Sequence, residues 1–213
     1  MLSQIDEALR TLVRTEALDG AEVDVVLDAP TKEWAARRNA PTVDLYLYDI
    51  REDLRRRERG WAEERDDDGR LSTRRPAPRF FKMSYLVTAW TQRPEDEHQL
   101  LAAVLRCFLR YDAVPDRLVA GALAETGLEV PITIGQPPPE DRGFADVWSA
   151  LGGELKPSLD VVVVAPMHTG IVYPAAPLVR EETHVDVADR RDGGREERRH
   201  RHTPPPRRVV AGP

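Results

Sequence analysis

The feature that most constrains the fold is a strongly charged segment, residues 51–79, which lies between two segments with the pattern of β-strands. It holds ten arginines and eight carboxylates, and its only large apolar residues are Leu54, Trp61 and Leu71. A segment with so few apolar side chains cannot form a core strand or helix on its own. The flanking patterns therefore predict a long antiparallel hairpin with this charged excursion at its tip. Loops of such length inside a compact domain are uncommon, and they are usually functional or disordered.

The two flanking segments, residues 42–50 and 80–90, carry apolar side chains on both of their alternating faces. This pattern is typical of strands that are covered on both sides of a sheet. Apolar and polar side chains alternate enough in residues 21–28 to predict a short strand. Residues 128–134 and 159–165 predict two more. The last of these contains an unbroken run of valines, which favours a place at the centre of the sheet.

Two segments have the apolar spacing of long amphipathic helices. The first, residues 1–18, begins with a candidate capping box made by Ser3 and Asp6. The second runs from Pro94 to Arg110 and carries carboxylates in its first turn, where the helix dipole favours them. Its apolar stripe consists of Leu100, Leu101, Val104, Leu105, Phe108 and Leu109.

Shorter helical patterns cover residues 32–38 and 144–151, each with one tryptophan. The order of elements predicts an α/β (α+β) fold, in which two long amphipathic helices pack against a mixed sheet of about five strands. We expect one domain over residues 1–179, with the charged excursion between two of its strands. Residues 180–213 form a low-complexity tail rich in arginine, histidine and proline, and we expect it to be disordered in the isolated protein.

No motif for catalysis or cofactor binding is present. The sequence lacks the glycine-rich phosphate loops of nucleotide-binding proteins and the G-x-S-x-G motif of hydrolases. Its single cysteine, Cys107, lies in the apolar stripe of the second long helix, where a small buried hydrophobe is a much better interpretation than a nucleophile. A single cysteine also excludes an internal disulfide. We therefore expect no enzymatic activity and no cofactor.

Two patterns match a metal site only in part. Residues 64–69 match the first half of a calcium-binding loop, but the place that must supply a bidentate carboxylate is Arg75. His200 and His202 have a spacing suited to a shared metal, but arginines flank them and no carboxylate follows. The sequence therefore predicts no metal site.

The formal net charge is −6, and no run of 18 or more apolar residues is present. The chain as a whole is thus no electrostatic match for DNA or an anionic membrane, and neither a transmembrane helix nor a secretory signal is predicted. We expect a cytoplasmic protein, and later release as part of a larger particle stays open. The arginine-rich end of the tail, residues 198–213, suits weak phosphate contacts, but docking on an acidic protein surface is at least as good an interpretation.

Six motifs occur in an order that matches one family. They are APTKEWAARR (29–38), PTVDLYLYDIREDL (41–54), SYLVTAW (84–90), PEDEHQLL (94–101), DVWSALG (146–152) and KPSLDVVV (156–163). Any one of them alone would be a weak signal, but their order is specific. Over about residues 1–180 the sequence resembles the cap, or tail-terminator, proteins of contractile phage-tail-like injection systems, a family long described as a domain of unknown function.

This resemblance implies a structural role in assembly and not a catalytic one. Such proteins are taken to form a ring of six that seals the distal end of the tube and sheath, which stops polymerisation and fixes length. The implied partners are other copies of this chain, the sheath protein and the inner tube protein. An adaptor that binds protein partners through its charged segments without forming a ring is the alternative. Both interpretations assign the charged excursion and the tail to docking.

No short motif marks the contact residues of the family. The junction at residues 48–54 is our preferred contact, because it lies where a strand leaves the core and combines an aromatic ring with paired charges. The alternative is that Tyr48 packs on the sheet and that Arg51 and Glu52 are solvated. The predicted interface residues are Tyr48, Arg51, Glu52, Asp53, Leu54, Arg55, Arg56, Arg57, Trp61, Arg198, Arg199 and Arg201.

Overall fold

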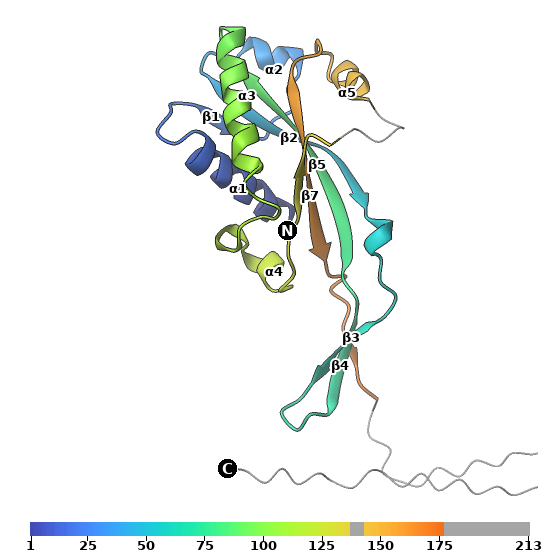
Figure 1. The fold of residues 1–213 in the computed structure, drawn as a ribbon. Coiled ribbons are helices and arrows are strands. Elements are labelled where there is room, and N and C mark those ends of the chain that lie inside the picture. The colour runs from blue at the N-terminus through green and yellow to red at the C-terminus, as the bar shows by residue number, and fades with distance from the viewer. Residues whose placement is uncertain (137–142, 177–213) are drawn as a thin grey trace, which may run out of the picture.

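The computed structural model describes residues 1–136 and 143–176, and its centre is a five-stranded sheet with strand order β1-β2-β5-β7-β6 (Figure 1). β1 runs parallel to β2, and the other neighbours are antiparallel. The predicted mixed sheet of five strands is confirmed. The strands are β1 (Asp24–Val26), β2 (Thr42–Glu52), β5 (Arg79–Trp90), β6 (Ile132–Ile134) and β7 (Ser158–Met167).

The long hairpin predicted around the charged segment is formed by β2 and β5. Their pairing runs from Thr42 opposite Trp90 to Glu52 opposite Phe81, with a register shift between Leu47 and Asp49. β7 pairs with β5 over ten residues and has β6 on its other side, so its valine run lies inside the sheet, as its sequence predicted. β6 is shorter than the strand predicted over residues 128–134.

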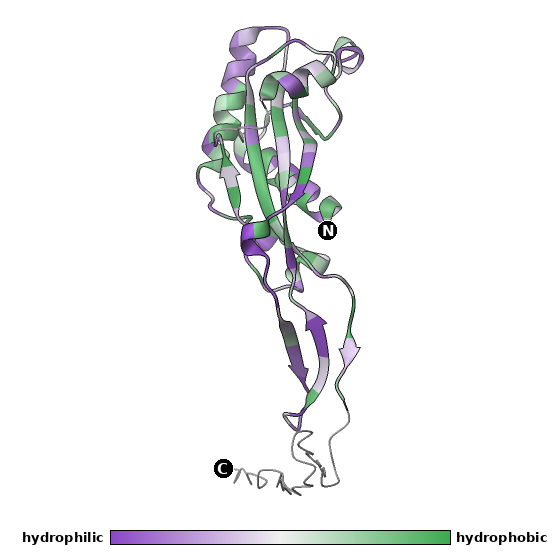
Figure 2. Ribbon diagram, turned by 90° about the vertical axis from the view of Figure 1, so that its right-hand side faces the viewer, coloured by the Kyte–Doolittle hydropathy of each residue, from purple (hydrophilic) through white to green (hydrophobic). Residues whose placement is uncertain are grey.

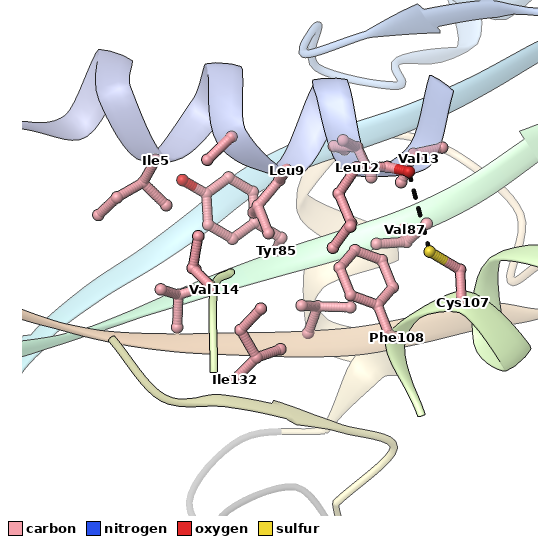
Figure 3. Packing of buried hydrophobic residues seen from close by; sticks show 14 of the residues in the cluster. Ile5, Leu9, Leu12, Val13, Tyr85, Val87, Cys107, Phe108, Val114 and Ile132 are labelled. Carbon is pink, nitrogen blue, oxygen red and sulfur yellow. Dashed lines mark hydrogen bonds between the residues drawn. The ribbon is translucent and has the colours of Figure 1, made fainter. Parts of the chain in front are cut away.

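Two helices, α1 (Leu2–Leu12) and α3 (Pro94–Phe108), cover one face of this sheet (Figure 1). α1 continues into a π-helical turn, η1 (Val13–Ala17). The helical stripes and the alternate side chains of the strands meet in one apolar core (Figure 3). Its fully buried members include Ile5, Leu9, Leu12, Val43, Leu45, Tyr85, Val87, Val104, Phe108 and Val163.

Two details of these helices differ from the prediction. Ser3 and Asp6 do not form a capping box, because Met1 is the N-cap and Asp6 instead accepts a hydrogen bond from the Tyr85 hydroxyl (2.8 Å) in β5. α3 ends at Phe108, so Leu109 is its C-cap and is 67% exposed, although its position in the sequence predicts burial. The acidic first turn of α3 is present as predicted.

The opposite side of the sheet carries two short helices, α2 (Lys32–Ala36) and α5 (Phe144–Ala150). Each contributes a tryptophan to a row centred on Trp90. The ring of Trp34 lies 5.3 Å from that of Trp90 in an edge-on arrangement, and the ring of Trp148 lies 6.4 Å away. The Lys156 ammonium group lies 4.0 Å above Trp90. These aromatic and cation–π contacts fix both short helices to the sheet.

The charged segment forms structure of its own. β3 (Trp61–Arg65) and β4 (Leu71–Pro76) pair as a hairpin, and β8 (Tyr173–Pro174) adds a third strand beside β4. We call these three strands the arm sheet. It projects from the end of the main sheet (Figure 1) and is mostly hydrophilic (Figure 2). The excursion thus adds nothing to the core, as its composition predicted, but it is a folded arm and not an irregular loop.

The remaining elements are short. They are η2 (Leu54–Arg56), η3 (Asp116–Leu118) and α4 (Gly121–Ala124). No helix within the described ranges combines the length and the apolar character needed to cross a membrane.

Candidate protein-docking surface

Tyr48 lies at the register shift of β2, where the strand begins to leave the core. Its hydroxyl donates a hydrogen bond to Asp160 Oδ1 (3.0 Å) in β7. Burial and the neighbouring Asp160 carboxylate raise the pKa of Tyr48 to about 12, so the phenol stays protonated at neutral pH. Burial also raises the pKa of Asp160, and the hydrogen bond from Tyr48 opposes that rise. Tyr48 is therefore held against the sheet of its own chain and is only partly exposed.

Tyr48 also lines a groove of about 320 Å³ between the sheet and α5. Its walls include Lys82, Ser84, Phe144, Val147, Asp160 and Val162. Apolar side chains therefore share this groove with hydroxyl and charged groups. Tyr48, Asp49 and Arg51, which belong to the junction predicted as a contact, also line it.

The root of the arm is a cluster of ion pairs at the end of β2 and the start of β5. Arg79 Nε donates to Glu52 Oε1 (2.7 Å), and the Nη2 group of Arg79 donates to Glu52 Oε2. Arg57 Nε adds a second cation 3.6 Å from Glu52 Oε1. The hydrogen bonds from Arg79, with the charges of both arginines, lower the pKa of the Glu52 carboxyl. Glu52 therefore stays ionised and links the two strands that enter the arm.

Asp53 organises the other half of the root. Its buried carboxylate caps η2 by accepting the Arg55 backbone N–H (3.3 Å). Lys82 Nζ lies 3.6 Å away and Arg56 Nε 4.0 Å away. The Arg56 guanidinium also lies above the Phe80 ring at 5.6 Å. These contacts leave Leu54, between Asp53 and Arg55, 67% exposed.

The partial calcium-loop pattern falls in the hairpin turn between β3 and β4. Asp66 accepts backbone hydrogen bonds from Gly69 (2.8 Å, to its carbonyl) and Arg70 (2.8 Å, to its carboxylate). Glu64 is engaged by Arg75 and by the Thr73 hydroxyl (2.6 Å), so its carboxylate supports the sheet. Within residues 1–136 and 143–176, no group of three or more His, Cys, Asp or Glu side chains is placed to hold a metal ion.

Exposed apolar side chains gather on the arm sheet. Trp61 opens β3 and is 55% exposed, and its ring meets that of Tyr173 edge-on at 5.2 Å. Ile171 and Val172, which precede β8, are about half exposed as well. The sequence prediction missed residues 171–173. Their signal was a run of three large apolar residues a few positions before the low-complexity tail.

The structure brings most of the predicted interface residues into one neighbourhood. Those of residues 48–57 follow one another from the β2 register shift through η2, and Arg51 pairs there with Asp49 (2.7 Å). Trp61 lies further along, at the start of the arm sheet. Arg198, Arg199 and Arg201, like the rest of the tail, lie outside the described residues. The contact role of these residues stays a prediction.

Cys107 is buried in the core, and its Sγ lies 3.8 Å from the Leu12 carbonyl (Figure 3). Burial raises the pKa of its thiol, and the nearby Arg110 partly opposes this. A thiol that is buried and protonated has the properties of a small hydrophobe, which is the role that its sequence position predicted.

Comparison with solved structures finds several chains of similar fold, among them the following two. The first is the sheath/tube terminator of PVC, an extracellular contractile injection system, in its extended state, with a TM-score of 0.64 and 20% identity over 89% of this chain. The second is the tube-terminating cap of the anti-feeding prophage, with a TM-score of 0.53 and 22% identity over 86% of this chain. The matches cover 65% and 60% of those two chains, so this chain spans less than two thirds of either.

Comparison with curated proteins finds no match. Among protein families, the Pvc16 N-terminal domain matches residues 4–181, which contain all six motifs and every described element except the first two residues of α1. The resemblance inferred from the motifs is thereby confirmed. The chain belongs to the Pvc16 N-terminal domain family.

Proposed function

We propose that this chain caps the distal end of a contractile injection system, where it binds the last subunits of sheath and inner tube and ends their polymerisation. The observation that carries this proposal is the fold that the chain shares with a sheath/tube terminator and a tube-terminating cap, together with its family match over residues 4–181. The work is structural and needs no catalytic group or cofactor. The first neighbour belongs to an extracellular particle, so release of this chain within such a particle is part of the proposal.

The capping unit is a ring, with six copies as the expected number. A subunit of a closed ring contacts two neighbours through two different surfaces, and a cap must also contact the sheath and the tube below it. A small domain built on one main sheet offers limited surface for this many partners. The arm extends the reach of the chain beyond its core, which is what such an arrangement needs (Figure 1).

The arm and its root are proposed to make the contacts with these partners. The root residues Arg51 to Arg57 and Trp61 combine arginines, an exposed leucine and an exposed tryptophan, which are side chains suited to protein interfaces. Arg198, Arg199 and Arg201 in the tail are proposed to add contacts of the same kind. The single domain over residues 1–179 is proposed to be the capping unit, and residues 180–213 a docking extension.

Labelling tests the position of this chain on the particle. Particles assembled with a tagged chain are treated with gold-coupled antibody and viewed by electron microscopy. The proposal expects label at one end of each particle only. Label along the whole sheath would favour an adaptor that does not form a cap. Label found only on unbound chain, beside unlabelled particles, would also contradict a cap.

A further inference from the structure

The arm sheet has two faces of different character. Neighbouring strands place paired residues on the same side, and Trp61 is paired with Pro76 while Arg74 is paired with Tyr173. We call the side with Trp61, Glu63, Arg74, Pro76 and Tyr173 the aromatic face. The other side, with Glu64, Thr73 and Arg75, is the polar face.

The polar face is satisfied within the chain. Glu64 accepts a hydrogen bond from Thr73 and pairs with Arg75 across the two strands. The aromatic face is not: Trp61 and Tyr173 touch each other but are 55% and 46% exposed. A small sheet whose largest apolar side chains remain in solvent gains stability when a partner covers them. Aromatic side chains of this kind carry much of the binding energy of protein interfaces.

Two arginines of the segment that leads into β3 have no side-chain partner among the described residues. The side chains of Arg55 and Arg59 are exposed and form no ion pair or hydrogen bond within the described part of the chain. Most other cations of the arm are paired, including Arg57, Arg74 and Arg75. The surface that complements Arg55 and Arg59 is therefore acidic.

The rest of the described chain has an excess of acidic residues. Residues 1–50, 80–136 and 143–167, which we call the body, contain 11 basic and 20 acidic residues, whereas the arm segment 51–79 contains ten and eight. In a ring, each contact joins two different surfaces of the same chain. A basic, aromatic arm and an acidic body on one chain provide the two complementary surfaces.

We infer that the aromatic face, with Arg55 and Arg59, docks on the acidic body of a second copy of this chain. The inference rests on the ring proposed above and names the surface that holds neighbouring copies together. Sheath and tube then bind elsewhere on the cap.

Charge reversal tests the electrostatic part of this contact. Arg55→Glu with Arg59→Glu changes two exposed side chains that form no ion pair or hydrogen bond among the described residues, so the variant should remain folded. We expect at least about tenfold weaker self-association of the full chain, measured by sedimentation equilibrium. The matched control is Lys32→Glu with Arg106→Glu, which makes the same charge change at two exposed cations of the body that form no ion pair in the described structure. The control should associate as the wild type does.

A second pair of variants tests the aromatic part. Trp61→Ser with Tyr173→Ser removes both exposed rings, and we expect at least about thirtyfold weaker association. Ala62→Ser, at an exposed position paired with Arg75 and therefore on the polar face, is the control and should leave association within about threefold of wild type. Hydrogen exchange of the β3 and β4 amides shows whether each variant retains its arm. If Trp61→Ser with Tyr173→Ser unfolds the arm sheet, the association of the Arg55→Glu with Arg59→Glu variant alone tests the inference.

A wild-type chain that stays monomeric up to about 100 μM overturns the inference, and so does self-association that both arm variants retain. The capping proposal fails in a different way. If the chain self-associates through the arm but never reaches particle ends, the surface is assigned correctly and the function is wrong. If the arm variants still cap particles as rings, the function stands and the assigned surface is wrong.

Discussion

The guanidinium group of Arg79 forms two hydrogen bonds with the carboxylate of Glu52, and these residues stand at the two points where the chain passes between the main sheet and the arm. One residue ends β2 and the other begins β5. The pairing of the main sheet stops beside them, and the pairing of the arm sheet starts only at Trp61 and Pro76. The direction of the arm therefore depends on side-chain contacts at its root.

Glu52→Gln is expected to loosen the arm without unfolding the body. A neutral amide keeps the size of the side chain but loses the charge that attracts Arg79 and Arg57. Hydrogen exchange should accelerate in β3 and β4 and stay unchanged in α3 and β7. Glu125→Gln, at an exposed position after α4, is the control and should change neither region. Equal exchange of the arm amides in wild type and Glu52→Gln would mean that the ion pairs do not restrain the arm.

Asp44 makes stability depend on pH. Its carboxylate is fully buried in β2, and neither oxygen has a hydrogen-bond partner of normal geometry among the described residues. Burial, with the nearby Asp28 charge, raises its pKa to about 8, although Arg38 and the backbone amides of Asp28 and Leu45 oppose this. Because an unfolded aspartate has a pKa of about 3.9, the native state binds more protons between these values, and the free energy of unfolding falls as pH rises from about 4 to about 8.

Asp44→Asn should remove this slope, which amounts to at most about 1.4 kcal/mol per pH unit. The variant is expected to be more stable than wild type at pH 8 and to lose most of that advantage at pH 5. Urea unfolding from pH 5 to pH 9 measures this, with the exposed Asp19→Asn as control. Parallel pH profiles for wild type and Asp44→Asn would show that Asp44 ionises normally in the folded chain.

Two adjacent residues at the end of α3 should respond very differently to truncation. Phe108 is buried against α1 and the sheet (Figure 3), so Phe108→Ala is expected to lower the free energy of unfolding by about 3–5 kcal/mol. Leu109 is 67% exposed, so Leu109→Ala should change it by less than about 0.5 kcal/mol. Denaturant unfolding compares the two. A similar loss of unfolding free energy in both variants would show that Leu109 is buried and that α3 does not end at Phe108.

The core of this fold could be predicted from its sequence because its signals are local. Alternation in residues 42–50 and 80–90 was enough for the β2–β5 hairpin, and apolar stripes were enough for α1 and α3. Leu109 shows the limit of such patterns, since α3 ends at Phe108, two residues before the predicted end, and so exposes a side chain that the stripe would bury.

The arm could not be predicted in the same way. β3 and β4 bury no face, so their charged residues lack the alternation that marks a strand, and cross-strand ion pairs such as Glu64–Arg75 stabilise them instead. β8 is only two residues long and pairs with a strand about a hundred positions earlier. The candidate surface was therefore found in part: the root and Trp61 were predicted, but Tyr173, which completes the aromatic face, depends on that distant pairing.

The length of assembled particles tests the capping proposal most directly. The sheath protein, the tube protein and the other components of the particle are expressed with and without this chain, and particle lengths are measured by electron microscopy. The account predicts a narrow length distribution with the chain, and a broad distribution that extends to longer particles without it. Restoring the wild-type chain should narrow the distribution again. Identical length distributions with and without the chain would contradict a terminator function.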